Sequence, residues 1–175
     1  MTYPGLKDLE AELVDVPKLD ANLLRSRSRD HYWFSPILRS ELDGKSADVA
    51  LVPENREQLI RVASACARHR VPVTVRGAGT GNYGQAVPIK GGVLLDMTRF
   101  NRVISSAPGV GRFEAGARLL EIDRAISGQG WELRFFPSTR KHATIGASLP
   151  AGQGELDPAL GGNWLIQEQC WPSRS

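Results

Sequence analysis

The sequence predicts an α+β fold made of two small lobes. A strand, a helix and a second strand follow one another between residues 47 and 75, which is the order of a βαβ unit. A glycine-rich loop, residues 76–84, comes directly after the second strand. Further strands and a second amphipathic helix follow between residues 103 and 126. The first lobe is therefore a βαβ lobe, and the second lobe combines strands with one helix.

The first 45 residues are expected to form an N-terminal extension. Residues 6–14 carry apolar side chains at helical spacing, which predicts a short amphipathic helix. Residues 15–45 are mixed in composition, and the aromatic run Tyr32–Phe34 is expected to anchor this stretch against a neighbouring surface. The first lobe is then expected to begin at residue 46.

The βαβ unit begins with residues 47–52, a mostly apolar run that Pro53 ends. Asn55 is a good N-cap for the following helix, and Gln58 stands three residues on, as in a capping box. One helical stripe is expected to face the core: Leu59, Ile60, Ala63, Cys66 and Ala67. Pro72 closes the connection to the second strand, which should run parallel to the first through a right-handed crossover.

The glycine-rich loop reads Arg-Gly-Ala-Gly-Thr-Gly-Asn-Tyr-Gly from residue 76 to residue 84. Such a loop can bring successive backbone N–H groups close to an anion without side chains in the way, so the natural guest is a phosphate or a pyrophosphate. It is not a P-loop, because no Lys-Ser/Thr pair follows it. It is also a poor dinucleotide fingerprint, because residues 85–88 lead into another turn instead of a helix. A glycine-rich hairpin without a ligand is the alternative.

Residues 92–97 form the next expected strand and belong to the first lobe, residues 46–101. The second lobe follows, and residues 103–104 and 112–115 suggest its first strands. The second helix carries its apolar residues between 119 and 126 and ends at residues 128–130, Gly-Gln-Gly. This order places the glycine loop near the junction of the lobes, where a cleft would suit an extended dinucleotide.

Composition argues against several classes of function. With 41% hydrophobic residues the 175-residue chain can bury a core, so disorder throughout is not expected. The net charge of +3 is mild, and the cluster of Arg25, Arg27 and Arg29 is expected to be a solvated face. Without a broad basic stripe or a recognition motif, we expect no nucleic-acid partner.

Cysteine and histidine usage and hydropathy bound the remaining classes. Cys66 and Cys170 give no disulfide framework. His31, His69 and His142 show no metal-ligand spacing, so no metal is expected. No apolar run is long enough for a membrane span, and the N-terminus lacks a signal-peptide core, so we expect a cytoplasmic protein.

Five segments, in order, resemble the FAD-binding domain of the p-cresol methylhydroxylase and vanillyl-alcohol oxidase type, the PCMH type. They are residues 50–54 with the helix after them, 71–81, 91–97, 113–117 with the second helix, and 136–146. The resemblance covers about residues 46 to 146 and implies a two-lobed α+β domain that binds FAD. The chain looks most like glycolate oxidase subunits and D-lactate dehydrogenase-like FAD-linked oxidases.

The resemblance also implies which residues hold the pyrophosphate of FAD. In the family FAD lies between the two lobes, and backbone amides of the glycine loop bind its pyrophosphate. Here those amides belong to Gly77, Ala78, Gly79, Thr80 and Gly81, with Asn82 flanking them. Arg76 could supply a cation near the phosphates or cap the end of the sheet, and both alternatives stay open.

A second segment of the family runs along the flavin and its ribityl chain. Here it offers Pro137, Ser138, Thr139, Thr144 and Gly146, with the three hydroxyl side chains as the expected donors. Ordinary turn residues are the alternative. Some relatives attach flavin covalently through a histidine of the glycine loop, and Thr80 stands at that position here. Non-covalent FAD is therefore expected.

The resemblance implies an FAD-dependent oxidoreductase that oxidises a hydroxyl or a 2-hydroxy acid, a small-molecule substrate, by hydride transfer to FAD. Relatives place substrate-binding and base residues in a separate C-terminal domain, so the catalytic residues are unknown here and this chain alone is expected to be inactive. One alternative is a non-catalytic FAD-binding module that works with a partner subunit. The other is an inert truncated product.

Residues 147–175 do not continue the resemblance. The family runs from Ala-Thr-Ile-Gly into a glycine-rich run and later an Asp-Pro-Gly turn. If the reading frame is shifted from Gly146 onward, permissible codons spell Gly-Phe-Ile-Ala-Gly-Gly-Ser-Gly-Gly-Ile-Gly-Ser, and residues 165–168 give Asp-Pro-Gly. We therefore expect a frameshifted tail, caused by one base lost near codon 146, and an incomplete second lobe. A divergent genuine tail is the alternative.

Overall fold

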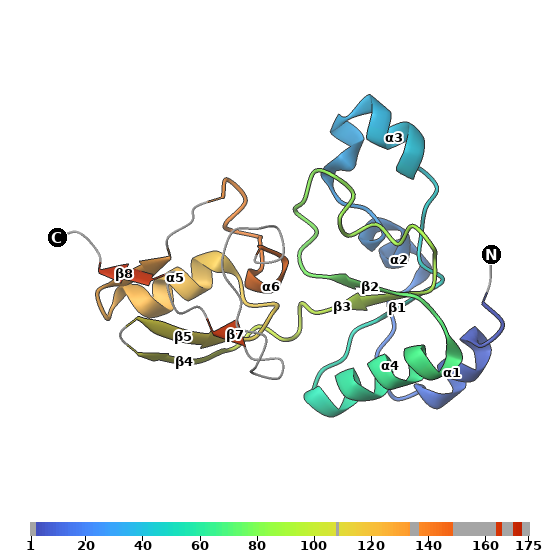
Figure 1. Cartoon of the computed structure of the whole chain (residues 1–175), viewed down its shortest axis with the longest axis horizontal. Helices are drawn as coiled ribbons and strands as arrows, with labels where there is room; N and C mark the ends of the chain where they lie inside the picture. The colour runs from blue at the N-terminus through green and yellow to red at the C-terminus, as the bar shows by residue number, and fades with distance from the viewer. Residues whose placement is uncertain (1–2, 108, 134–136, 149–163, 166–169, 173–175) are drawn as a thin grey trace. The chain divides into compact units, whose positions relative to one another are not determined.

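The computed structural model describes residues 3–107, 109–133 and 137–148, and the backbone of residues 164–165 and 170–172. The chain divides into two compact units, Met1–Arg99 and Phe100–Ser175 (Figure 1). The predicted α+β class is confirmed, because the first unit holds a parallel sheet with helices and the second holds antiparallel strands with helices. The domain boundaries after residues 45 and 146 stay predictions.

A three-stranded parallel sheet forms the centre of the first unit. Its strands are β1 (Val49–Leu51), β2 (Val73–Arg76) and β3 (Val93–Asp96), and β3 lies between the other two. Helix α4 (Arg56–His69) connects β1 to β2. Both strands run parallel to β3, so the predicted parallel βαβ unit is confirmed.

Helix α4 begins at the predicted N-cap. The Asn55 side chain accepts a hydrogen bond from the Gln58 N–H at 2.8 Å, and the Gln58 amide oxygen accepts one from the Glu54 N–H at 2.9 Å. This reciprocal pair resembles a capping box and satisfies two N–H groups at the helix start.

The buried face of α4 differs from the predicted stripe. Ile60, Ala63 and Ala67 are exposed, so the prediction is wrong for them. The fully buried residues of the helix are Val62, Ala65 and Cys66. Alanines on several sides of a helix are compatible with more than one buried face, and the packing against the sheet and α1 selects this one.

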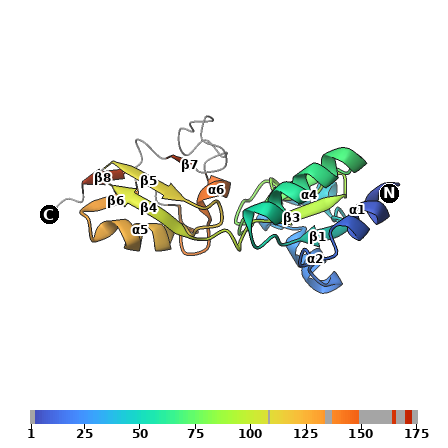
Figure 2. The same cartoon turned by 90° about the horizontal axis from the view of Figure 1, so that it is seen from below.

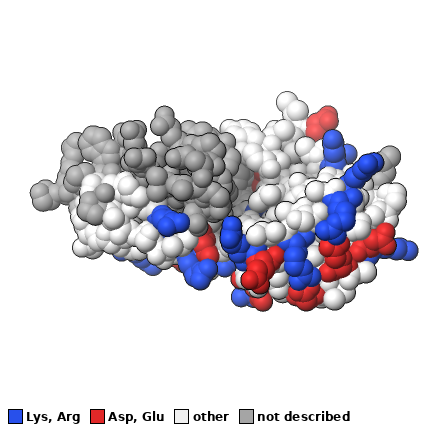
Figure 3. Space-filling view, turned by 60° about the horizontal axis from the view of Figure 1, so that its bottom comes forward, with Lys and Arg blue, Asp and Glu red and all other residues white. Residues whose placement is uncertain are grey.

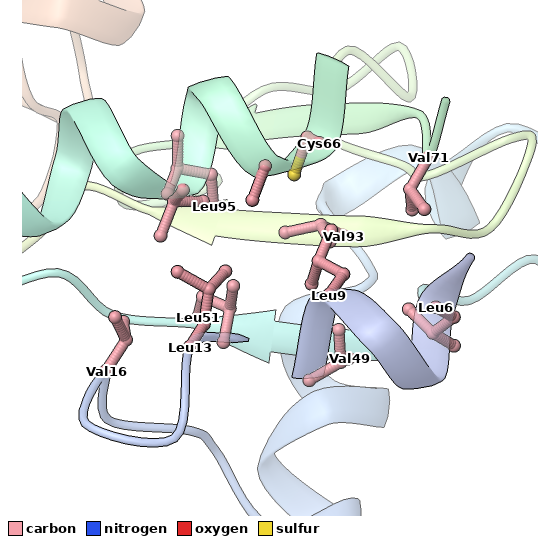
Figure 4. Packing of buried hydrophobic residues seen from close by; sticks show 12 residues of the cluster. Leu6, Leu9, Leu13, Val16, Val49, Leu51, Cys66, Val71, Val93 and Leu95 are labelled. Carbon is pink, nitrogen blue, oxygen red and sulfur yellow. The ribbon is translucent and has the colours of Figure 1, made fainter. Parts of the chain in front are cut away.

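The two faces of the sheet bury alternate residues of the same strands. The residues that pack against α4 and α1 (Leu6–Glu12) are Val49, Leu51, Val93 and Leu95. Ala50 and Leu94 lie in a second cluster, with Leu24 of α2 (Ala21–Arg27). Figures 1 and 2 show α4 and α2 on opposite faces of the sheet, and Figure 4 shows the packing on the α1 side. The predicted N-terminal helix is confirmed as α1, and it belongs to the core of the first unit.

Ion pairs join the N-terminal segment to α4. Arg61 pairs with Asp15 at 2.7 Å, and Arg68 pairs with Glu12 at 2.6 Å. Because these side chains are partly solvated, each pair contributes little to stability. In Figure 3 positive and negative side chains lie interspersed over the face in view, without a single-sign patch among the coloured residues.

Between α2 and β1 the chain forms η1 (His31–Phe34), a 3-10 helix, and α3 (Pro36–Leu42). Tyr32 is 1% exposed and its hydroxyl donates to the Asp43 carboxylate at 3.0 Å, so the predicted anchor is confirmed for this residue. Trp33 and Phe34 are 44% and 76% exposed, and the prediction is wrong for them.

The second unit combines a hairpin with one principal helix. Strands β4 (Val103–Ala107) and β5 (Val110–Phe113) pair antiparallel, and α5 (Leu119–Ser127) buries its apolar side next to them (Figure 1). Strand β6 (Trp131–Leu133) and the short helix α6 (Ile145–Ser148) follow.

Two short strands lie within residues 147–175, the predicted tail. Strand β7 (Trp164–Leu165) pairs with β5, and β8 (Cys170–Pro172) pairs with β6. In the described part of the chain, no helix is long and apolar enough to cross a membrane. The same residues contain no cluster of three His, Cys, Asp or Glu side chains that could hold a metal ion.

Candidate phosphate-binding loop

The glycine loop leaves the end of β2 with a row of free donors. The backbone N–H groups of residues 77–82 donate no hydrogen bond to any described residue. Residues 77–81 are half-buried and Asn82 is exposed. Backbone N–H groups without a protein acceptor must bind water or a ligand, so these six groups are available to an anion. These six N–H groups belong to the same residues that the sequence predicts to bind a pyrophosphate.

Gly79 stands at the tightest point of the loop. Its φ of +70° lies in the left-handed region that side chains disfavour. A Cβ atom built there would lie 2.0 Å from Nη2 and 2.2 Å from Cζ of Arg76. Two separate features therefore favour glycine at this position. The backbone conformation disfavours any side chain, and the Arg76 guanidinium occupies the space that a Cβ atom would need.

The Arg76 side chain fixes the loop through hydrogen bonds to backbone carbonyl oxygens. It donates from Nη1 to the carbonyl oxygens of Arg27 and Arg29, both at 2.6 Å, and from Nη2 to the carbonyl of Ala78 at 3.2 Å. Burial, and then the nearby Arg27 charge, lower the pKa of Arg76, while Asp96 and Asp30 act in the opposite direction. These contacts support the structural alternative for Arg76, and its predicted role at the phosphates stays a prediction.

Asp30 is a residue that the sequence analysis missed. It is 2% exposed, and its Oδ1 accepts hydrogen bonds from the N–H groups of Tyr32 at 3.0 Å and Gly84 at 3.3 Å. Within the described residues, Asp30 Oδ2 and Arg76 Nε are buried without a hydrogen-bond partner. The only sequence signal was an Asp before an aromatic run, which is a common N-cap pattern.

The second predicted segment lies in the second unit. Pro137 and Thr139 are half-buried, Ser138 is exposed and Thr144 is 2% exposed. The Thr144 hydroxyl is buried and has no hydrogen-bond partner among the described residues. A buried hydroxyl without a partner is unfavourable, and a ligand or water that bonded to it would relieve that penalty.

Gly146 is fixed by the turn after β5. Its N–H donates to the carbonyl of Ala115 at 2.8 Å, so this group is already paired. A Cβ atom at Gly146 would lie 2.6 Å from Ala115 Cβ and 2.8 Å from Ala115 O. These contacts explain why a glycine stands here, and its predicted contact with FAD stays a prediction.

Phosphate-binding domains commonly use this arrangement, a parallel βαβ sheet that leads into a glycine-rich loop with N–H groups available to an anion. The residues fit the pyrophosphate of a dinucleotide, because their N–H groups have no acceptor among the described residues and N–H groups bind an anion well. The chain belongs to the FAD binding domain family, whose sequence pattern matches residues 47–156. The matched range ends within the predicted tail.

The chain is similar in sequence to a glycolate oxidase subunit and to a D-lactate dehydrogenase. It is 36% identical over 154 residues to the glycolate oxidase subunit GlcD of Escherichia coli K12, covering 79% of this chain and 31% of that protein. It is 30% identical over 117 residues to the D-lactate dehydrogenase of Anaerostipes hadrus, covering 65% of this chain and 24% of that protein. The chain thus spans about a third or less of the length of these relatives.

Solved structures support the fold. An alkyldihydroxyacetonephosphate synthase superposes with a TM-score of 0.69 at 22% identity, over 85% of this chain and 32% of its own. p-Cresol methylhydroxylase with substrate bound superposes with a TM-score of 0.64 at 19% identity, over 83% of this chain and 28% of its own. The predicted resemblance to the PCMH type is confirmed.

Proposed function

We propose that this chain is the FAD-binding part of an FAD-linked oxidoreductase that oxidises a hydroxyl or a 2-hydroxy acid. The observation that carries the proposal is the row of six N–H groups, residues 77–82, which have no acceptor among the described residues and lie inside the segment that matches the FAD binding domain family. The substrate class is inferred from two relatives, a glycolate oxidase subunit and a D-lactate dehydrogenase.

In this proposal the chain binds and positions the cofactor. The N–H groups of residues 77–82 bind the pyrophosphate, and Arg76 keeps the loop in place through its carbonyl contacts. Ser138, Thr139 and Thr144 bind along the flavin and its ribityl chain, where the Thr144 hydroxyl lacks a partner in the described part of the chain. When bound, the flavin ring supplies the hydride acceptor, and the protein tunes and shields it.

A titration with matched ligands tests the binding step. The 175-residue chain is titrated with FAD and with riboflavin, which has the same ring but no phosphate, while flavin fluorescence is followed. We expect FAD to bind at least tenfold more tightly than riboflavin, and ADP to compete with FAD. Equal affinity for the two flavins would contradict the pyrophosphate assignment, and absence of FAD binding would favour the inert product.

The attachment of FAD is expected to be non-covalent. Thr80 occupies the position at which some relatives carry the histidine that bonds to flavin, and a threonine hydroxyl is a much weaker nucleophile. Acid precipitation should therefore release the flavin into the supernatant. Fluorescent flavin that stays with the denatured polypeptide would contradict this part of the proposal.

An activity assay separates the enzyme from a non-catalytic module. Anaerobic addition of glycolate or D-lactate to the FAD-loaded protein should bleach the flavin if the substrate site is present. Since relatives place that site outside the matched segment, the assay includes co-purified partner subunits. Flavin that is bound yet never bleached in any such mixture would favour the non-catalytic module.

The proposed location of the protein is the cytoplasm.

The tail is proposed to be out of frame. The support is the codon pattern after Gly146, from which permissible codons give the glycine-rich run of the family. Resequencing the gene around codon 146 is the direct test. A confirmed sequence without a missing base, together with a transcript that encodes residues 147–175 as written, would refute it.

A further inference from the structure

A segment that precedes the family-matched residues holds the glycine loop at three places. Residues 27–32 run from the end of α2 into η1, and the family match begins only at residue 47. The loop residues that this segment reaches are Ala78 (through Arg76), Gly81 and Gly84. They are spaced three residues apart, so the contacts span the loop.

The first contact runs through Arg76. Two backbone carbonyls of the segment, those of Arg27 and Arg29, accept hydrogen bonds from one guanidinium nitrogen, and the Ala78 carbonyl accepts from the other. A planar guanidinium fixes several acceptors at once. It therefore ties the first half of the loop to the segment.

The other two contacts come from the next residues of the segment. The His31 N–H donates to the carbonyl of Gly81 at 2.8 Å, and the Gly84 N–H donates to Asp30 Oδ1 at 3.3 Å. Gly84 has a φ of +79°, one of several conformations open to a glycine, and the bond to Asp30 helps to select it. The same Asp30 oxygen accepts from the N–H of Tyr32, a residue that is 1% exposed. The Asp30 carboxylate is thus bonded to the backbone of a residue whose side chain is buried, Tyr32.

We propose that residues 27–32 form a brace that positions the glycine loop for the pyrophosphate, with Asp30 as its positioning residue. The inference rests on the proposed function. A glycine-rich loop loses much conformational freedom when it is ordered, and a ligand that must order it binds more weakly. The brace orders the loop beforehand. It also uses loop carbonyls and the Gly84 N–H as its contacts, which leaves the N–H groups of residues 77–82 free.

Asp30 is the position at which the brace can be tested. Asp30→Ala removes the acceptor of the Gly84 and Tyr32 N–H groups, whereas Asp30→Asn keeps an oxygen in the same place. Asp48→Ala is the matched control, because the Asp48 carboxylate also accepts from the N–H of a glycine, Gly92, at 2.7 Å. Gly92 likewise has a positive φ, of +74°, but it lies outside the loop.

The first measurement is amide hydrogen exchange of the 175-residue chain without ligand. The His31 amide reports the brace because it bonds to Gly81 and not to Asp30. In the wild type it should exchange at least tenfold more slowly than the free Thr80 amide. Asp30→Ala should remove that protection while amides of α4 keep theirs. Equal exchange of His31 and Thr80 in the wild type would overturn the brace, whether or not any variant folds.

The second measurement is FAD affinity. Asp30→Ala should weaken FAD binding at least tenfold, while Asp30→Asn and Asp48→Ala should stay within threefold of the wild type. Wild-type FAD affinity in a folded Asp30→Ala variant would overturn the proposal, as would an equal loss in Asp30→Asn. If the wild type shows a protected His31 amide but binds no FAD, the proposed function fails and the role of the brace at a pyrophosphate fails with it.

Discussion

Replacing Gly79 with valine perturbs the loop in two separate ways. The backbone there has a φ of +70°, which a β-branched residue adopts only under strain. The new Cβ would also lie 2.0 Å from Nη2 and 2.5 Å from Nη1 of Arg76. Since neither contact is possible, the guanidinium must move away from its carbonyl acceptors or the loop must change its shape.

The magnitude follows from these two effects. A left-handed conformation costs a non-glycine residue about 1–2 kcal/mol. Losing one hydrogen bond of the Arg76 guanidinium, such as that to Ala78, costs about 1.5–3 kcal/mol more. The binding-competent loop is then penalised by about 2.5–5 kcal/mol, and at about 1.4 kcal/mol per tenfold the lower figure weakens FAD binding about 60-fold.

The assay compares FAD affinity and the free energy of unfolding for Gly79→Val, Gly79→Ala and Gly128→Val. Alanine already carries the offending Cβ, so it should lose most of the affinity too. Gly128 has a φ of −62° and open space where a Cβ would stand, and it serves as the control. FAD affinity of Gly79→Val equal to that of the wild type would refute the reasoning.

Three further predictions concern other positions. Gly146→Ala should destabilise the second unit by about 1–3 kcal/mol in urea unfolding, because the Cβ collides with Ala115; Gly128→Ala should cause no loss, and equal effects would contradict the packing argument. Burial raises the pKa of the Cys66 thiol to about 11, so iodoacetamide should label it slowly at neutral pH in the folded chain and rapidly in urea, as mass spectrometry can show. Hydrogen bonds from Arg68 and then His69 lower the pKa of Glu12 below its ordinary value of 4.5, so Glu12 stabilises the fold above that pH and the benefit is lost as the pH falls through the folded-state pKa. The stability gap between wild type and Glu12→Gln should therefore shrink on acidification, and a gap that grows would show the sign to be wrong.

Short sequence patterns predicted those parts of the fold that depend on residues close to one another in the chain. Asn55 caps its helix because a short polar side chain reaches the N–H three residues on. The strand ahead of the glycine loop ends as expected, since Gly77 follows directly after the β-branched run Val73–Val75 and Arg76. The free N–H groups of the loop also followed from the run of small residues.

The remaining parts depend on contacts that no residue pattern reports. Arg27 and Arg29 were interpreted as a solvated cationic cluster, yet what they give the site is two backbone carbonyls, which any residue type could supply. Asp30 was missed for a related reason, because its partner Gly84 lies 54 residues away. Ile60 looked as apolar as a core residue, and only the docking of α1 and the sheet decides that it faces water.

The position of β3 in the middle of the first sheet determines how this unit can assemble. β1 and β2 each pair with β3 and not with each other. Among the described residues, the other edge of β1 carries an isolated bridge between Lys18 and Leu51 and no further strand. A nascent chain that ends before Val93 therefore has two strands without a common partner, and the sheet closes only when the last strand enters between them. Because the glycine loop lies between β2 and β3, we expect it to take its final shape only once β3 has paired with both neighbours.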